Sequence, residues 1–255
     1  MISYKNTSLS KLKILLWLGL FLTACKTINS SSTELCVLPY QVILSFDDGP
    51  NAYDDTTARL LDVLKKYDIH AIFSLLGENA EAYPDLVRRI HDEGHCIVNH
   101  GYSDKWALRM GKDEFRDNLL KGEAAISSAL GSEINPKLYR PQGGFYSAGQ
   151  KAICLEEGYT IVYSSVRVYD AVIKSEGKEK AVRQTLKKIE KQNGGIILLH
   201  DGRDSNSRME GKMKKNNHSA FDRSWIPEAT EEIILVLLEK GYNLNVSFNN
   251  VPEYK

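Results

Sequence analysis

The sequence contains few cysteines and no excess of charge of either sign. Only four of its 255 residues are cysteine, which excludes a disulfide-rich scaffold. No Cys-x-x-Cys pair occurs, so a zinc site built from thiolates is not expected. Lysine and arginine together number 33, as do aspartate and glutamate, and the formal net charge is zero. A nucleic-acid-binding protein would carry a basic excess, so no nucleic-acid partner is expected.

Near the N-terminus, the sequence lacks an apolar run long enough to cross a membrane. The run Ile14–Leu22 has nine residues, whereas a membrane span needs roughly 20. Three lysines precede the run and small residues follow it, a pattern typical of a secretory signal. One interpretation is an ordinary signal peptide, in which Cys25 after the run occurs by chance.

The end of this run, Leu22-Thr23-Ala24-Cys25, resembles the cleavage box of bacterial lipoproteins. This resemblance implies that residues 1–24 are a signal peptide and that Cys25 carries lipid. Residues 25–39 would form a flexible, lipid-anchored tether. We therefore expect an extracytoplasmic protein attached to a bacterial membrane. Lys26 is not the aspartate associated with inner-membrane retention, so an outer-membrane location is compatible with the sequence.

The rest of the chain has the composition of a globular protein, with 42% apolar and 26% charged residues. From about residue 40, short apolar strands alternate with amphipathic helices, which predicts one α/β domain with a mostly parallel sheet. Periodicity alone does not distinguish a barrel from an open sheet, but about seven units in 215 residues favour a short barrel. The expected strands are Gln41–Phe46, His70–Leu76, Cys96–Val98, Leu138–Tyr139, Thr160–Ser165, Gly195–Leu199 and Asn243–Phe248. The expected helices are Thr56–Tyr67, Tyr83–Glu93, Asp113–Leu130, Ser147–Glu157, Glu179–Gln192 and Glu228–Lys240. The polar segment Gly202–Ser224 is expected to be a functional or a disordered loop.

Polar side chains follow the predicted strands, where parallel α/β folds carry their chemistry. Adjacent side chains on an extended segment point to opposite sides. One carboxylate of the pair Asp47 and Asp48 could then hold a metal while the other accepts a proton from water. Three metal ligands could come from Asp48, His100 and Asp104, the last two sharing a face if their segment is helical or tightly turned.

Three further side chains fit acid–base catalysis around these residues. Arg140 could keep Asp47 ionised, and Asp170 could orient a protonated His200 as a general acid. Each of these residues also has a structural interpretation without chemistry. Asp47 and Asp48 could form a turn, His100 could be a buried structural histidine, and Asp104 could be a solvated loop residue.

Five segments in order resemble the motifs of the polysaccharide deacetylases, the family-4 carbohydrate esterases. The resemblance extends from about residue 40 to 248. The first four motifs are similar to Ser45–Asn51, Gly94–His100, Tyr139–Gly144 and a worn segment, Ser165–Asp170. The fifth is similar to Leu198-Leu199-His200-Asp201. Any one of these segments is a weak signal, but five in order are strong.

This resemblance implies a distorted (β/α)7 barrel and a metal-dependent deacetylase that acts on a polysaccharide. Asp47 would be the catalytic base, Arg140 would tether it, His200 would be the acid and Asp170 would tune that acid. Asp48 and His100 would bind the metal. The Gly143 N–H, together with the metal, would stabilise the oxyanion, and Leu198 would help line the acetyl pocket.

The chain departs from the family pattern at three positions. The family usually has a second histidine where this chain has Asp104, and a carboxylate ligand suits harder metals at least as well. We therefore expect one divalent ion, which could be zinc, cobalt, manganese or iron, and the carboxylate favours the last three. Ala171 replaces a tryptophan of the acetyl pocket, a wall that Trp106 or Trp225 could supply from a loop. Gly143 replaces a common tyrosine, which leaves the backbone N–H intact.

One histidine pair is not expected to bind zinc, and the pairing of the cysteines is not predicted. His91 and His95 have the spacing of a helical zinc pair, but Gly94 is expected to end the helix between them. Pairing among the cysteines after the lipidation site, Cys36, Cys96 and Cys154, is undetermined.

The predicted function is removal of acetyl groups, most simply N-acetyl groups of amino sugars, from a cell-envelope or exported polysaccharide such as peptidoglycan. The alternatives are an O-acetyl polysaccharide esterase, a catalytically impaired glycan-binding lipoprotein and a structural envelope lipoprotein.

Overall fold

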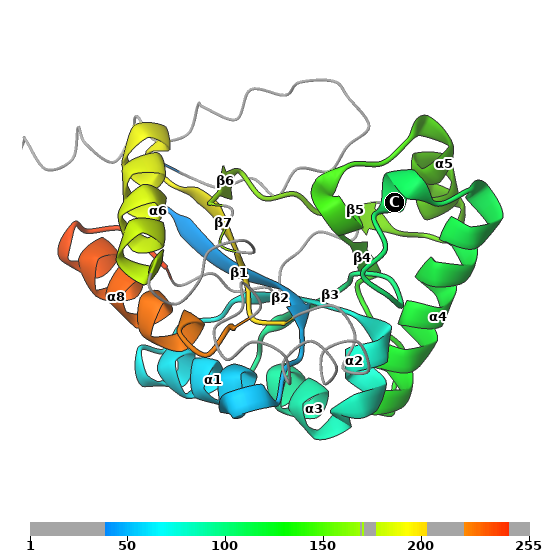
Figure 1. Ribbon diagram of the computed structural model, residues 1–255, viewed down its shortest axis with the longest axis horizontal. Coiled ribbons are helices and arrows are strands. Elements are labelled where there is room, and N and C mark those ends of the chain that lie inside the picture. Colours follow the sequence, from blue (N-terminus) through cyan, green and yellow to red (C-terminus); the bar gives the residue numbers. More distant parts are fainter. Residues whose placement is uncertain (1–38, 169, 171–176, 203–221, 245–255) are drawn as a thin grey trace, which may run out of the picture. The chain divides into compact units, whose positions relative to one another are not determined.

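Seven parallel strands form one sheet in the order β5-β4-β3-β2-β1-β7-β6 (Figure 1). The structure is a computed structural model that describes residues 39–168, 170, 177–202 and 222–244. All of them belong to one compact unit. The strands are β1 (Val42–Gly49), β2 (Ile72–Leu75), β3 (Cys96–Asn99), β4 (Leu138–Tyr139), β5 (Thr160–Ile161), β6 (Val166–Arg167) and β7 (Gly195–His200). The sheet curls into a half-barrel, which confirms the distorted (β/α)7 prediction.

Helices cover the outer side of the curled sheet (Figure 1). The longer ones are α1 (Thr56–Lys66), α3 (Pro84–Asp92), α4 (Lys112–Leu130), α5 (Ala148–Glu156), α6 (Lys178–Gln192) and α8 (Ile226–Glu239). In α1, Leu60, Leu61 and Leu64 are buried, as their helical spacing predicts. α4 ends at Gly131, whose φ of 74° suits glycine. These six helices match the predicted ones to within three residues at each end.

Strand β1 lies near the centre of the sheet, between β2 and β7. Its side chains from Val42 to Phe46 are fully buried, because a parallel strand in this position is covered on both faces. The strand extends past its predicted end at Phe46 and includes both aspartates. A register shift separates Asp47, opposite Ser74, from Gly49, opposite Leu75. Asp47 and Asp48 therefore lie within the end of β1 rather than in a following loop.

Three elements differ from the sequence prediction. The expected strand Thr160–Ser165 is wrong in its second half, because β5 ends at Ile161 and pairs with β4, while β6 begins at Val166 and pairs with β7. The chain thus moves from one edge of the sheet to the other within a few residues. Helix α2 (Gly77–Ala82) was not predicted, because its six residues carry no apolar periodicity. Of Asn243–Phe248, the described part forms an isolated bridge from Asn243 to Gln41.

Several sequence predictions lie outside the described residues. These are the signal segment, Cys25, nearly all of the tether, Cys36, Ala171 and most of the polar segment 202–224. Cys96 and Cys154 are buried free thiols, so they do not pair with each other. Burial raises the pKa of each thiol to about 12, which makes both unreactive near neutral pH. No helix within the described ranges has the length and apolarity needed to cross a membrane.

Candidate active site

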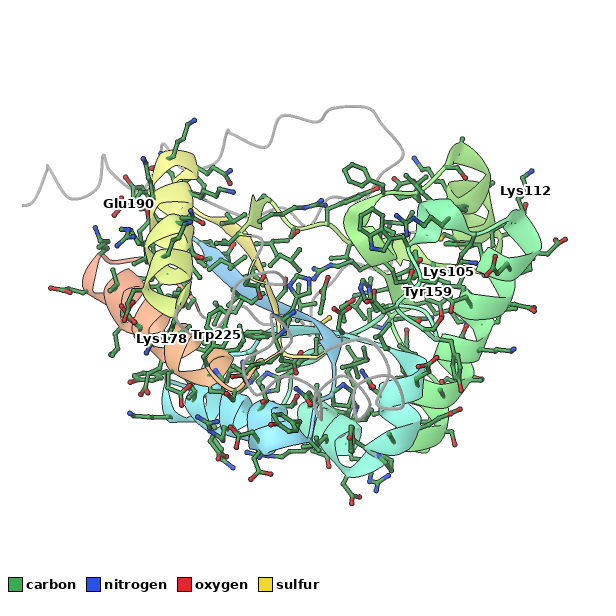
Figure 2. All side chains as sticks on the ribbon, viewed as in Figure 1. Lys105, Lys112, Tyr159, Lys178, Glu190 and Trp225 are labelled. Carbon is green, nitrogen blue, oxygen red and sulfur yellow. The ribbon has the colours of Figure 1, made fainter. Side chains whose placement is uncertain are left out.

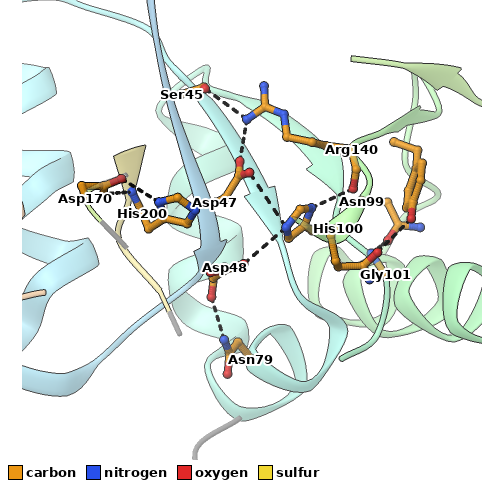
Figure 3. A network of polar contacts seen from close by, with 12 residues as sticks. Ser45, Asp47, Asp48, Asn79, Asn99, His100, Gly101, Arg140, Asp170 and His200 are labelled. Atoms are coloured by element: carbon orange, nitrogen blue, oxygen red, sulfur yellow. Dashed lines mark hydrogen bonds and ion pairs between the residues drawn. The ribbon is translucent and has the colours of Figure 1, made fainter. Parts of the chain in front are cut away.

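The carboxylate of Asp47 and the guanidinium of Arg140 form a buried ion pair at the carboxyl ends of the strands. Nη1 of Arg140 donates to Oδ1 of Asp47 at 2.5 Å and to Oγ of Ser45 at 3.0 Å (Figure 3). Asp47 and Arg140 are 4% and 3% exposed, so water screens this pair weakly. One carboxylate oxygen of Asp47 is therefore held, and Oδ2 remains for other chemistry. The ion pair joins the two residues to which the sequence analysis gave the roles of base and tether.

The carboxylates of Asp47 and Asp48 converge on the same imidazole. Nε2 of His100 lies 3.3 Å from Oδ1 of Asp48 and 3.9 Å from Oδ2 of Asp47. The expectation that the two side chains point to opposite sides is wrong. Asp48 has a φ of 69° at the bulge in β1, and this backbone conformation breaks the alternation of an extended strand. The side-chain amide of Asn79 donates to the carbonyl of Asp48 at 2.8 Å and supports the bulge (Figure 3).

His100 follows β3 and is fixed from behind by the backbone of Arg140. Its Nδ1 donates to the Arg140 carbonyl at 2.7 Å, because a carbonyl oxygen only accepts. The ring therefore turns Nε2 toward the two carboxylates. Burial lowers the pKa of His100, but the charges of Asp47, Asp48 and Asp104 and the contact with Asp48 outweigh it and raise the pKa. Burial likewise raises the pKa of Asp48, and His100, His200 and Arg223 together bring it below its ordinary value.

This donor set fits a divalent cation. With the hydrogen of neutral His100 on Nδ1, its Nε2 lone pair faces two carboxylates, an arrangement that a cation between them would stabilise. The carboxylate of Asp48 and Nε2 of His100 are the two donors already in place. Asp104 acts on His100 through its charge, but its segment is not helical. Within the described ranges, no three His, Cys, Asp or Glu side chains form a ready metal site. The ligand role of Asp104 thus stays a prediction.

A second acid–base pair lies beside the first, at the end of β7. Asp170 accepts from Nδ1 of His200 at 2.9 Å and from its backbone N–H at 2.7 Å. Burial lowers the pKa of His200, but the charge and hydrogen bond of Asp170, with Asp48 and Asp47, raise it to about 9. The raised pKa favours the protonated imidazole, which is the form that a general acid requires. Arg223, which the sequence analysis missed at the end of the polar segment, donates to the Asp170 carbonyl at 3.0 Å.

The two predicted pocket residues, Gly143 and Leu198, are both at least partly exposed. Gly143 is exposed and has a φ of 72°, which favours glycine. Leu198 is partly exposed, like His200, whereas Leu199 between them is buried. The alternation along β7 thus turns Leu198 and His200 to one face. Their roles as oxyanion donor and pocket wall remain predictions.

Sequence reasoning missed a buried support beneath the first motif. The carboxyl group of Asp201 accepts from the Thr57 hydroxyl at 2.5 Å, and its carbonyl accepts from the Asn51 amide at 3.0 Å. A Cβ at position 49 would lie 2.7 Å from the Asp201 carboxylate, so only glycine fits there. Burial raises the pKa of Asp201 to about 7. Its place directly after His200 was the only available signal.

Two other groups lie away from the cluster. Helix α3 ends at Asp92 before Gly94, so His91 and His95 do not share a helix, as predicted. Burial lowers the pKa of His95 to about 4, and its Nδ1 accepts from the Ala71 N–H. Trp225 is 5% exposed and packs in the main core next to α8 (Figure 2). It is therefore unsuited to the missing pocket wall, whereas Trp106 is exposed beside Gly143.

Known proteins share this chain's sequence pattern. Residues 37–162 match the family model described as polysaccharide deacetylase. A peptidoglycan-N-acetylglucosamine deacetylase of Bacillus cereus is 39% identical over 130 residues, which are 51% of this chain and 46% of that protein. The chain thus matches less than half the length of that relative. A chitooligosaccharide deacetylase of a Bradyrhizobium species is 33% identical over 161 residues, which are 63% of this chain and 70% of the relative.

Solved structures share the fold. A peptidoglycan N-acetylglucosamine deacetylase bound to a benzamide compound has a TM-score of 0.67 and 29% identity, covering 85% of this chain and 90% of the other. A family 4 acetyl xylan esterase from Clostridium thermocellum, in complex with a cobalt ion, has a TM-score of 0.61 and 28% identity, covering 80% and 86%. A Bacillus anthracis pseudoenzyme, at 19% identity and a TM-score of 0.62 over 85% and 68%, shares the fold alone. The sequence matches and the fold together establish that the chain belongs to the polysaccharide deacetylase family.

Proposed function

We propose that this protein hydrolyses N-acetyl groups of amino sugars in a cell-envelope or exported polysaccharide such as peptidoglycan. The observation that carries the proposal is the placement of two complete pairs, Asp47–Arg140 and Asp170–His200, on either side of Asp48 and His100. A glycan-binding protein needs neither a held carboxylate base nor a protonated imidazole acid. Relatives named for peptidoglycan and chitooligosaccharide deacetylation support the substrate class.

Each side chain has a chemical role in this proposal. Oδ2 of Asp47, left free by Arg140, takes the proton from the attacking water. Nε2 of His200 gives its proton to the leaving nitrogen, while Asp170 holds Nδ1. The Gly143 N–H donates to the oxyanion of the tetrahedral intermediate. Asp48 and His100 would hold one divalent ion, with Asp104 as the third candidate ligand. Zinc, cobalt, manganese or iron bound there would supply Lewis acidity.

The location belongs to the same proposal. Lipid on Cys25 would hold the catalytic domain at the outer side of a bacterial membrane, within reach of an envelope glycan. Labelled fatty acid should enter the full-length protein and fail to enter a Cys25→Ser variant. Equal labelling of the two proteins would remove the lipid anchor from the proposal and leave the catalytic part untouched.

Acetate release from the full-length protein tests the catalytic part. The protein is stripped of metal and assayed on N-acetylglucosamine oligomers and peptidoglycan, with zinc, cobalt, manganese, iron or no metal added. Metal-dependent release that Asp47→Asn abolishes would support the proposal. A folded protein that releases no acetate with any metal would contradict it, and the impaired glycan-binding alternative would gain. We keep the glycan-binding alternative because a pseudoenzyme from Bacillus anthracis has the same fold.

An O-acetyl polysaccharide esterase is the second candidate. The similarity to an acetyl xylan esterase favours including it. Acetylated xylan is therefore assayed in parallel with the N-acetylated glycans. A kcat/KM on the O-acetyl substrate that exceeds the value on N-acetylglucosamine oligomers would select this candidate.

A further inference from the structure

Two consecutive glycines after β4, Gly143 and Gly144, lie next to side chains from other segments. A Cβ at position 143 would lie 3.0 Å from Cγ and Cδ2 of Trp106, which precedes a short 3-10 turn after β3. A Cβ at position 144 would lie 2.6 Å from Nη1 of Arg167 on β6. Trp106 therefore occupies space that a side chain at position 143 would need. A larger side chain at position 143 would need Trp106 to move.

The side chains around these glycines pair cations with aromatic rings. The guanidinium of Arg109 lies 4.7 Å from the ring centroid of Trp106, and that of Arg167 lies 5.9 Å from the ring centroid of Phe145. Trp106 and Phe145 are 52% and 62% exposed, although both are large apolar residues. Such contacts hold an arginine over a ring and leave its N–H groups available. We call Trp106, Arg109, Phe145 and Arg167 the aromatic–arginine rim.

The charge of the rim is positive. Neither Arg109 nor Arg167 forms an ion pair with another residue that the structure describes. Lys105, next to Trp106 in the chain, is neutralised by Glu114. Asp104 acts on His100, on the metal side. The exposed Arg109 and the half-buried Arg167 thus lie near Gly143 and Gly144 without a carboxylate partner among the described residues.

We propose that the aromatic–arginine rim binds a sugar that carries a carboxylate, next to the N-acetylglucosamine unit being deacetylated. The inference rests on the proposed function, because that function places the acetyl group against the Gly143 N–H. Neighbouring sugar rings then reach Trp106 and Phe145. Arginine binds carboxylates through two parallel N–H groups. The rim thus selects an anionic glycan such as peptidoglycan over a neutral chitooligosaccharide.

Three ligands separate charge from sugar recognition. They are a neutral N-acetylglucosamine tetramer, soluble peptidoglycan glycan strands, and the same strands with their carboxylates converted to amides. With the full-length, metal-loaded protein, we expect a KM about tenfold lower for the native strands than for the amidated ones. Arg109→Gln and Arg167→Gln should each raise the KM for native strands about threefold to tenfold. Arg109→Lys should restore only part of the loss, because lysine lacks the planar fork.

The matched control is Arg183→Gln, an exposed arginine on α6, a helix that packs beside α8 (Figure 1). This variant should leave both KM values unchanged. Higher salt should weaken native-strand binding and leave the tetramer unaffected. Equal KM values for native and amidated strands in the parent protein would overturn the inference. So would unchanged KM values in both arginine variants.

Titration calorimetry measures glycan binding by the rim independently of acetate release. The three ligands are titrated into the full-length protein and the same variants, with acetate release measured alongside. Selective binding of native strands without any acetate release would uphold the rim and contradict catalysis. Acetate release with equal affinity for native and amidated strands would uphold catalysis and reject the rim.

Discussion

The carboxylate of Asp170 binds His200 twice, through the ring Nδ1 at 2.9 Å and the backbone N–H at 2.7 Å. The second bond fixes the carboxylate to the strand end, so the imidazole has one orientation. The same carboxylate is the largest of the effects that raise the pKa of His200 against the opposing effect of burial. Asp170 thus both orients the His200 ring and favours its protonated form.

Asp170→Asn should move the alkaline limb of the pH–activity profile to lower pH. The raised pKa of about 9 keeps His200 protonated, and activity falls as pH rises through that value. Removing the Asp170 charge lowers this pKa, so the acid form is lost at a lower pH. A bound cation also lowers it, which puts the parent's limb at or below pH 9. We expect kcat at neutral pH to fall about 10- to 100-fold. A variant with reduced kcat but an unshifted limb would contradict this role.

Metal should stabilise the fold through Asp48 and His100. Because the folded chain presents these donors together, a metal present at a hundredfold excess over its Kd should add about 2.7 kcal/mol to the free energy of unfolding. Thermal denaturation of stripped protein with and without cobalt measures this gain. Asp48→Asn should lose most of it. An equal rise in Tm for parent and variant would place the metal elsewhere.

Asp104→His should preserve or raise metal-dependent activity, because it restores the family's usual ligand. Asp104→Ala should weaken metal affinity if the carboxylate is a ligand. Equilibrium titration with cobalt, followed by its visible absorption, measures the affinity of each variant. If Asp104→Ala binds cobalt as tightly as the parent, the residue acts only through its charge on His100.

Arg140→Met should destabilise the protein strongly. It leaves the buried carboxylate of Asp47 without its partner, a change that typically costs about 3–5 kcal/mol. Urea denaturation of metal-free protein at neutral pH measures the difference. Arg116→Met is the matched control, because Arg116 pairs with Glu156 and Glu157 at the surface and its loss should change little. Similar destabilisation by the two substitutions would show that burial does not strengthen the Asp47 pair.

Gly143→Ala should cost more stability than Gly131→Ala. Both positions have a positive φ, 72° and 74°, where a side chain costs about 1–2 kcal/mol. A Cβ at position 131 meets nothing within 4 Å, whereas one at position 143 meets Trp106. Adding Trp106→Ala should remove the extra cost, which a double-mutant cycle of unfolding free energies measures. A cycle with no coupling would mean that the two residues are not in tight contact.

The class of fold and the residues of the main cluster can be predicted from the amino-acid sequence. Apolar runs and helical spacing are local signals, so the longer helices were predicted closely. The five motifs stand at strand ends, and a parallel sheet brings such ends to one edge. Asp47, Asp48, His100, Arg140, Asp170 and His200 therefore meet as expected. The family resemblance supplied their roles, which no spacing rule provides.

How these residues face one another depends on the packing of the folded chain. The positive φ of Asp48 turns both aspartates toward His100, and a bulge is set by pairing with the next strand rather than by local sequence. The placement of β5 and β6 at opposite edges of the sheet has the same origin, because two-residue strands carry no period of their own. The support from Asp201 depends on contacts about 150 residues apart in the chain. The choice of Trp106 over Trp225 beside Gly143 follows from burial, which only the packed chain defines.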